Sequence, residues 1–325
     1  MDILLSPVIL FFLLGVLAAA ARSDLSVPEP LAKSLSLYLM AAIGLKGGVQ
    51  VSQAGFSAEM GWVSLAGMGL SFAVPFMAFA LLRSLGGLDR LNAAAVSAHY
   101  GSVSLVTFVT ASDSLTRAGM APAGYLVAVM ALMETPAIVS GLLLARTAGT
   151  ARDRDEPAGG GHLWREVLLN GSVVLLLGAF LIGLAIGKDK FQTISPVFVA
   201  GFTGLLCLFM LDMGLIAMRR FRESRRLSWR LVAIALALPL VNGAIGLALA
   251  AALGLDPGTG AAFALLAASA SYIAVPAAIR LALPDADPGI YLSMSLAVTF
   301  PFNILAGIPL FSSLAVSLLG WETGS

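Results

Sequence analysis

Two pairs of serines occupy matching places in the two halves of the chain. Ser102 and Ser104 lie in GSVSLVT, and Ser269 and Ser271 lie in AASASYIA, each within a stretch of otherwise apolar residues. A hydroxyl group in an apolar span usually faces a cavity or a neighbouring helix, because hydrocarbon offers it no hydrogen-bond partner. Paired hydroxyls beside helix N-termini form a binding site for a small anion. The alternative is that the small serines only let helices pack closely.

Each serine pair lies where the sequence predicts an interrupted helix. Gly101 permits a break in the first stretch, and Pro276 suits the first turn of a helix that restarts in the second. Ser104 and Ser271 are the predicted N-caps of the restarting helices. Two such N-termini that meet near the centre of a bilayer direct N–H groups and positive dipole ends at a bound anion.

Two larger side chains flank the predicted breaks. Tyr272 directly follows the second serine pair, so its hydroxyl could reach the anion or close the cavity, or its ring could simply pack. His99 precedes Gly101 by two residues, and hydrogen-bonded packing is predicted for it rather than a proton relay. The residues themselves therefore predict a substrate site made of Gly101, Ser102, Ser104, Ser269, Ser271 and Tyr272.

Further polar side chains inside apolar spans are candidates for binding a coupling ion. Glu134 lies in METPAIV, and a carboxylate at that depth costs roughly 2.5 to 3.5 kcal/mol on insertion scales. A role in coupling to a cation or a proton is predicted for it, with a structural hydrogen bond as the alternative. The other candidates for a coupling-ion site are Asn242, Thr299, Asn303 and Asp212. Lys46 is expected to extend towards the lipid headgroups instead.

The elements that hold these residues must be membrane helices. The chain has 325 residues, of which 59% are hydrophobic and 11% charged, whereas an ordinary soluble domain has about 25% charged residues. Apolar stretches of about 20 residues are long enough to cross a bilayer. The ten predicted spans are residues 3–21, 31–51, 61–85, 92–111, 121–146, 166–187, 194–218, 229–253, 259–282 and 288–319.

The ten spans divide into two similar sets of five. Residues 87–107 aligned without gaps on residues 254–274 match at 7 of 21 positions, at an offset of 167 residues. Because each set has an odd number of spans, the second enters the bilayer from the opposite side, as in many secondary transporters. The predicted fold is all-α, with broken spans 4 and 9 crossing at mid-membrane. The expected units are 1–147, a cytoplasmic linker at 148–165, and 166–325.

The basic residues predict the orientation of the spans. Fifteen of the 19 Lys and Arg residues lie in or beside the odd-numbered connections, and four lie at the even-numbered ones. The positive-inside rule then places the odd connections in the cytoplasm and both termini outside it. A multi-pass protein embedded in the lipid bilayer is expected.

The motifs GSVSLVT, METPAIV, AASASYIAVPAAIR and LPDADPGIYL together resemble the sodium-dependent bicarbonate transporter family of cyanobacteria and other bacteria. The resemblance extends over nearly the whole chain. It implies a core domain with crossed broken helices, a gate domain, a homotrimer, and location in the bacterial inner (plasma) membrane. It also implies sodium-coupled import of bicarbonate. The positions that match the family's binding motifs are Gly101, Ser104, Thr107, Ser269 and Ser271.

The chain departs from the family pattern within the breaks. Leu105 and Val106 stand where cyanobacterial members have small or hydroxyl residues, and Tyr272 stands where they have an acidic residue. Glu134 matches an acidic residue of the family, so one candidate cation ligand is kept. The resemblance also implies a possible PII-like regulatory partner, and the linker, which is shorter than in many cyanobacterial members, weakens that expectation.

The predicted function is secondary active transport of a small anion, with bicarbonate as the substrate, Na⁺ as the coupling ion and no other cofactor or metal. The alternatives are transport of another small monocarboxylate or inorganic anion with proton coupling or none, and an anion channel. An enzyme is not expected, because the sequence lacks the Gly-x-Ser-Gly pattern of intramembrane serine proteases and Asp212 has no second intramembrane aspartate. Nothing in the sequence favours nucleic-acid binding.

Overall fold

The computed structural model describes residues 5–146, 171–223 and 227–320, and these ranges contain helices and no strand. The predicted linker at 148–165 lies outside the described residues. The helices of the first half are α1 (Pro7–Ala20), α2 (Glu29–Ala54), α3 (Ala58–Ser84), α4 (Arg90–Gly101), α5 (Leu105–Arg117) and α6 (Leu126–Arg146).

The second half begins with α8 (Gly171–Gln192) and a π-helical turn at Pro196–Ala200. The helices that follow are α9 (Phe202–Glu223), α10 (Trp229–Ala252), α11 (Pro257–Ala268), α12 (Ala274–Ala282), α13 (Pro288–Leu292), α14 (Phe300–Phe302) and α15 (Ile308–Leu319). The segments Ser293–Thr299 and Asn303–Gly307 are π-helical and join α13, α14 and α15 into one long helical stretch.

Seven stretches of the described chain are long and apolar enough to cross a membrane, which agrees with an all-helical membrane protein. The other three predicted spans correspond to shorter pieces. α1 has 14 residues, α8 is bent where Gly187 adopts a φ of 64°, and the fourth span of the second half is divided into α11 and α12. Ten membrane crossings therefore stay a prediction.

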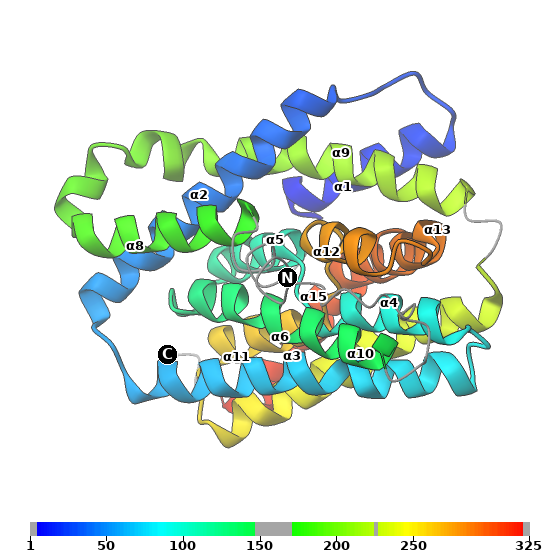
Figure 1. The fold of residues 1–325 in the computed structure, drawn as a ribbon. Coiled ribbons are helices and arrows are strands. Elements are labelled where there is room, and N and C mark those ends of the chain that lie inside the picture. The colour runs from blue at the N-terminus through cyan, green and yellow to red at the C-terminus, as the bar shows by residue number, and fades with distance from the viewer. Residues whose placement is uncertain (1–4, 147–170, 224–226, 321–325) are drawn as a thin grey trace.

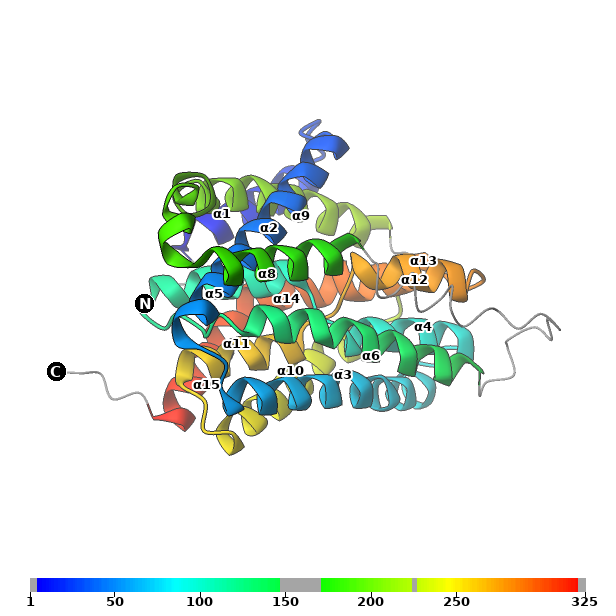
Figure 2. The same cartoon turned by 60° about the vertical axis from the view of Figure 1, so that its left-hand side comes forward.

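The helices form two layers (Figures 1 and 2). α1, α2, α8 and α9 make up one layer, in which α2 packs along α8 and α1 packs along α9. The other layer contains α3, α4, α6, α10, α11 and α15, and the short helices α5, α12, α13 and α14 lie between the two layers. The layers therefore each combine helices from both halves of the sequence.

Glycines let the helices of the first layer touch backbone to backbone. A Cβ atom at Gly48 would collide with the Phe180 carbonyl oxygen on α8, and one at Gly183 would collide with the Leu45 carbonyl on α2. α1 and α9 cross in the same way at Gly15 and Gly214. Close approach through small residues is a common way for membrane helices to associate, because lipid provides no hydrophobic force between them.

The repeated Gly-Leu-Asp motif lies directly before α4 and directly before α11. Gly87 and Gly254 have φ angles of 69° and 67°, a backbone conformation that glycine adopts without strain. Asp89 then caps α4 by accepting a hydrogen bond from Asn92 N at 2.9 Å, and Asp256 caps α11. Three of the matches between the halves therefore position the start of α4 and of α11 rather than bind a ligand.

Candidate functional site

Both predicted helix breaks are present. The first break, Ser102–Ser104, separates α4 from α5, and the second, Ser269–Ile273, separates α11 from α12. Ser104 is the N-cap of α5 as predicted, and its Oγ accepts a hydrogen bond from Thr107 N at 3.2 Å. The N-cap residue of α12 is Ile273 rather than Ser271, because the second break is longer, but Ser271 Oγ still accepts from Val275 N in the first turn of that helix at 3.4 Å.

The two breaks are bonded directly to each other. The Ser104 N–H donates to the Oγ of Ser269 at 2.8 Å. The Ser271 N–H donates to the backbone oxygen of His99 at 2.9 Å, and the His99 Nδ1 lies 2.6 Å from the backbone oxygen of Ser271. Since a carbonyl oxygen only accepts, Nδ1 carries a proton. His99 therefore holds the second break against the end of α4.

His99 is fully buried and its ring stacks on Tyr291, with the ring centres 4.7 Å apart. Its Nε2 has no hydrogen-bond partner among the described residues. The prediction of a hydrogen-bonded packing role agrees with these contacts. The contact with the second break was not predicted, because the residue it joins lies 172 positions away in the chain.

Gly101 has a different role from the predicted one. It is the last residue of α4, its φ is not positive, and the break begins after it. A Cβ atom at this position would collide with the ring of Pro75 on α3 and lie 2.7 Å from the Ser71 carbonyl oxygen. Proline has no N–H to bond that carbonyl, which is four residues earlier, so the Ser71 carbonyl lacks its usual helical donor. Glycine therefore lets α4 approach α3 closely at Pro75.

A second proline within a helix, Pro239 in α10, explains the hydrogen bond that the Thr299 hydroxyl makes. Pro239 leaves the Ala235 carbonyl without its helical donor, and Thr299 Oγ1 donates to that oxygen at 2.7 Å. The Tyr100 hydroxyl then donates to Thr299 Oγ1, also at 2.7 Å, because the only hydroxyl hydrogen of the threonine is already used. Thr299 thus joins α4 to α10.

A small cavity opens where the two breaks meet. Polar side chains of Ser104, Ser271, Tyr272 and Glu134 line it together with Met40 from α2 and Leu176 from α8. The cavity therefore lies between the two layers and places the predicted coupling residue beside the predicted substrate residues. The volume of this cavity is about 20 Å³, which is enough for about one water molecule. A larger ligand does not fit the cavity at this size.

No sequence pattern indicated that Met40 and Leu176 close the site. Both are ordinary apolar residues in apolar helices, and nothing in their spacing separates them from neighbours that face lipid or protein. Only the packing of α2 along α8 brings them over the breaks.

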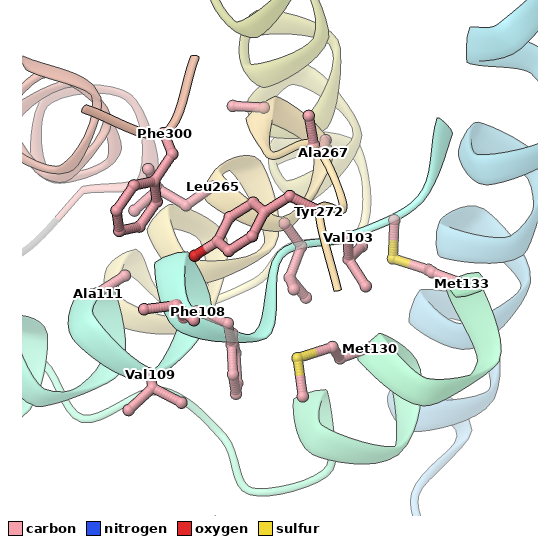
Figure 3. Close-up of a cluster of buried hydrophobic side chains, with 14 of the residues drawn as sticks. Val103, Phe108, Val109, Ala111, Met130, Met133, Leu265, Ala267, Tyr272 and Phe300 are labelled. Atoms are coloured by element: carbon pink, nitrogen blue, oxygen red, sulfur yellow. The ribbon is translucent and has the colours of Figure 1, made fainter. Parts of the chain in front are cut away.

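Tyr272 lies among apolar side chains (Figure 3). Its ring meets Phe300 edge to face, with the ring centres 5.3 Å apart, and it lies beside Val103 of the first break. The side chain is buried, and its hydroxyl has no hydrogen-bond partner within 3.5 Å among the described residues. Tyr272 therefore occupies part of the space between the breaks and offers one unused polar atom there.

Other buried polar atoms around the breaks also have no partner in the described chain. They are Ser102 Oγ, Thr107 Oγ1 and Glu134 Oε2. Nearly all buried polar groups in folded proteins are hydrogen-bonded, so such a concentration indicates a site that is completed by a ligand. The first turn of α5 adds backbone N–H groups that have no carbonyl within the helix to bond. Hydroxyls and N–H groups suit an anion, and a carboxylate suits a hard cation.

The remaining coupling-ion candidates are placed away from the cavity. Asn303 Nδ2 donates to the Ala268 carbonyl at 2.9 Å, at the residue before the second break, and its Oδ1 has no partner in the described part of the chain. Asp212 on α9 and Asn242 on α10 are buried, but neither lines the cavity. Within the described ranges, no three His, Cys, Asp or Glu residues are grouped as a metal site.

No curated protein matches this sequence. At the level of families, the model described as the Na⁺-dependent bicarbonate transporter superfamily matches residues 7–316, a range that includes both breaks, Glu134 and all residues of the cavity. The match confirms the resemblance carried by the serine motifs, and membership of a transporter family argues against an enzyme. The chain therefore belongs to the Na⁺-dependent bicarbonate transporter superfamily.

Proposed function

We propose that this protein is a secondary active transporter that imports bicarbonate together with Na⁺. The observation that carries the proposal is the shared cavity, which is lined by Ser104, Ser271 and Tyr272 from the two breaks and by Glu134. The hydroxyls and the first turn of α5 provide donors for the anion. The carboxylate provides a negative charge for the cation, and the two opposite charges then stabilise each other in a poorly solvated space.

We also propose that the two halves form an inverted repeat with the odd connections in the cytoplasm. The packing supports this: α3 contacts α4 and α6 as α10 contacts α11 and α15. The glycine crossings follow a similar offset to the serine pairs, since Gly15 corresponds to Gly183 and Gly48 to Gly214. Bilayer crossing in opposite directions by two such units is typical of secondary transporters.

Uptake of ¹⁴C-bicarbonate into proteoliposomes tests the proposal. We expect an inward Na⁺ gradient to drive accumulation above the external concentration, and replacement of Na⁺ by K⁺ or choline to remove it. The rate should saturate with bicarbonate. Saturable uptake that does not depend on Na⁺ would contradict sodium coupling. An internal bicarbonate concentration that never exceeds the external one under any ion gradient would identify a channel instead.

A second candidate is transport of another small anion with proton coupling. It is favoured by Tyr272, which stands at the second break without the charge of the acidic residue that the family pattern has there. Glu134 is then the one carboxylate among the residues that line the cavity, and it could carry a proton in place of Na⁺. Uptake that follows a pH gradient and is unchanged by Na⁺ would support this candidate.

The serines of the cavity should determine the affinity for the anion. A hydrogen bond to a charged group contributes about 1.5 to 3 kcal/mol, so Ser104→Ala or Ser271→Ala should raise the half-saturating bicarbonate concentration roughly tenfold or more. Ser312→Ala is the matched control, because Ser312 is also buried but its hydroxyl donates only to Ile308 O within α15. Equal effects of the three variants on concentration-dependent uptake would mean that the serines only pack.

A further inference from the structure

A second and larger cavity lies at the end of the molecule where α2 and α5 end and α6 begins. Its volume is about 300 Å³, compared with about 20 Å³ for the cavity between the breaks. We call it the vestibule. The polar side chains among its lining residues are Lys46, Gln50, Ser112, Asp113 and Thr116. In the proposed orientation the vestibule faces the outside of the cell.

The vestibule continues the line of the smaller cavity. The same three helices line both spaces with residues about one helical turn apart. From the smaller cavity to the vestibule, the lining side chains are Met40 then Ile43 on α2, Leu105 then Val109 on α5, and Met130 then Val127 on α6. A ligand in the vestibule is therefore separated from the breaks by a short apolar constriction.

Lys46 is the one Lys or Arg among the residues that line the vestibule, and it has no direct ion pair. It is half-buried, and no carboxylate of the described residues lies within 4.0 Å of its ammonium group. Its Nζ instead lies 4.3 Å from the centre of the Phe202 ring, a cation–π contact that leaves N–H donors available. The sequence predicted that this side chain extends to lipid headgroups, but it lines the vestibule instead.

The nearby acidic groups are already engaged. Asp113 Oδ2 accepts from Arg117 Nε at 2.8 Å, and its Oδ1 accepts from the Thr203 hydroxyl at 3.2 Å. At the same end of the molecule, Glu59 accepts from the Tyr125 hydroxyl and Asp256 caps α11. The paired carboxylate of Asp113 is a poor cation site, whereas the unpaired ammonium group favours an anion.

We propose that the vestibule is an anion-collecting site, in which Lys46 holds a small inorganic monoanion such as bicarbonate before it passes the constriction to the breaks. The choice of bicarbonate rests on the proposed function. An ammonium group in a recess with low-dielectric walls raises the local concentration of anions and the rate at which they enter. Lys46 thus acts on capture of the substrate, while the breaks act on its transport.

Transport kinetics test the role of Lys46 in capture. Lys46→Met and Lys46→Gln should each lower the ratio of maximal rate to half-saturating concentration for bicarbonate roughly tenfold at low ionic strength, with the maximal rate little changed. Lys46→Arg should keep the ratio of the unmodified protein, because arginine carries the same charge. The difference should shrink when ionic strength is raised from about 10 mM to about 500 mM, because salt screens the ammonium charge. A drop in maximal rate alone, or a difference that salt does not alter, would overturn the proposal.

A labelling experiment tests the anion site without transport. Gln50→Cys in a Cys207→Ser background places a single thiol in the vestibule. We expect a methanethiosulfonate reagent with a sulfonate group to label it faster than one with a trimethylammonium group, and Lys46→Met to reduce that ratio roughly tenfold. Bicarbonate should slow the anionic reagent. An unchanged ratio would overturn the proposal, even if sodium-driven uptake is found. A Lys46-dependent ratio in a protein that imports no bicarbonate would keep the anion site and reject the proposed function.

Discussion

Glu134→Gln should abolish sodium-driven bicarbonate uptake, with a fall in rate of roughly 100-fold or more. Glutamine has nearly the same volume but no charge, so a cation beside the bound anion loses its counter-charge in the cavity. Loss of one partner from a buried charge pair costs about 3 to 5 kcal/mol, which corresponds to about a 100-fold to 4,000-fold loss of affinity. Initial uptake rates at several Na⁺ concentrations, together with size-exclusion profiles of the purified variant, measure the effect.

Glu29→Gln is the control for this change. It makes the same substitution at an exposed position in the first turn of α2, far in sequence from both breaks. Sodium-driven uptake by this variant should match that of the unmodified protein. If Glu134→Gln transports as well as Glu29→Gln, the carboxylate in the cavity has no part in coupling, and the cation must bind elsewhere.

Gly48→Val should prevent the two helices α2 and α8 from packing. The added Cβ would collide with the Phe180 carbonyl and lie 2.7 Å from the Leu184 nitrogen, and backbone atoms cannot turn aside as a side chain can. Overpacking costs typically 1 to 3 kcal/mol, and at a backbone contact we expect about 3 kcal/mol or more. The midpoint of thermal unfolding in detergent should therefore fall by roughly 10 °C, and the yield of monodisperse protein should drop.

Gly178→Val provides the comparison on the same pair of helices. Gly178 lies on α8, but a Cβ atom there would meet no other atom within 4 Å. Its thermal midpoint should stay within a few degrees of that of the unmodified protein. Equal losses in the two variants would show that glycine is needed for the conformation of the helices themselves rather than for their close crossing.

The sequence predicted the places of the two breaks because polar residues in apolar spans are conspicuous. The serine pairs marked both positions, and a serine that precedes an apolar helix is a common N-cap, which is the role that Ser104 has. The gapless alignment failed at Ser271, since it assumed breaks of equal length. The first break has three residues and the second has five, so the second helix starts two residues later than expected.

The walls of the site could not be predicted in the same way. Met40 and Leu176 come from helices that reach the breaks only through the packing of the two layers, and apolar residues in a membrane helix carry no sign of which neighbour they face. Gly101 was predicted to act through its own backbone freedom. Its actual constraint is the ring of Pro75 on another helix, a contact between distant residues that local sequence rules do not include.

The hydrogen bonds between the two breaks have a mechanical consequence. Ser104 is tied to Ser269, and His99 is tied to Ser271 from both its backbone and its ring, so neither break can slide past the other without losing buried hydrogen bonds in a medium that offers no replacement. The four half-helices α4, α5, α11 and α12 should therefore move together as one rigid body. When the cavity opens to the other side of the membrane, the contact that has to change is then the one between the breaks and the side chains of Met40 and Leu176. These apolar side chains can slide past the breaks without losing hydrogen bonds.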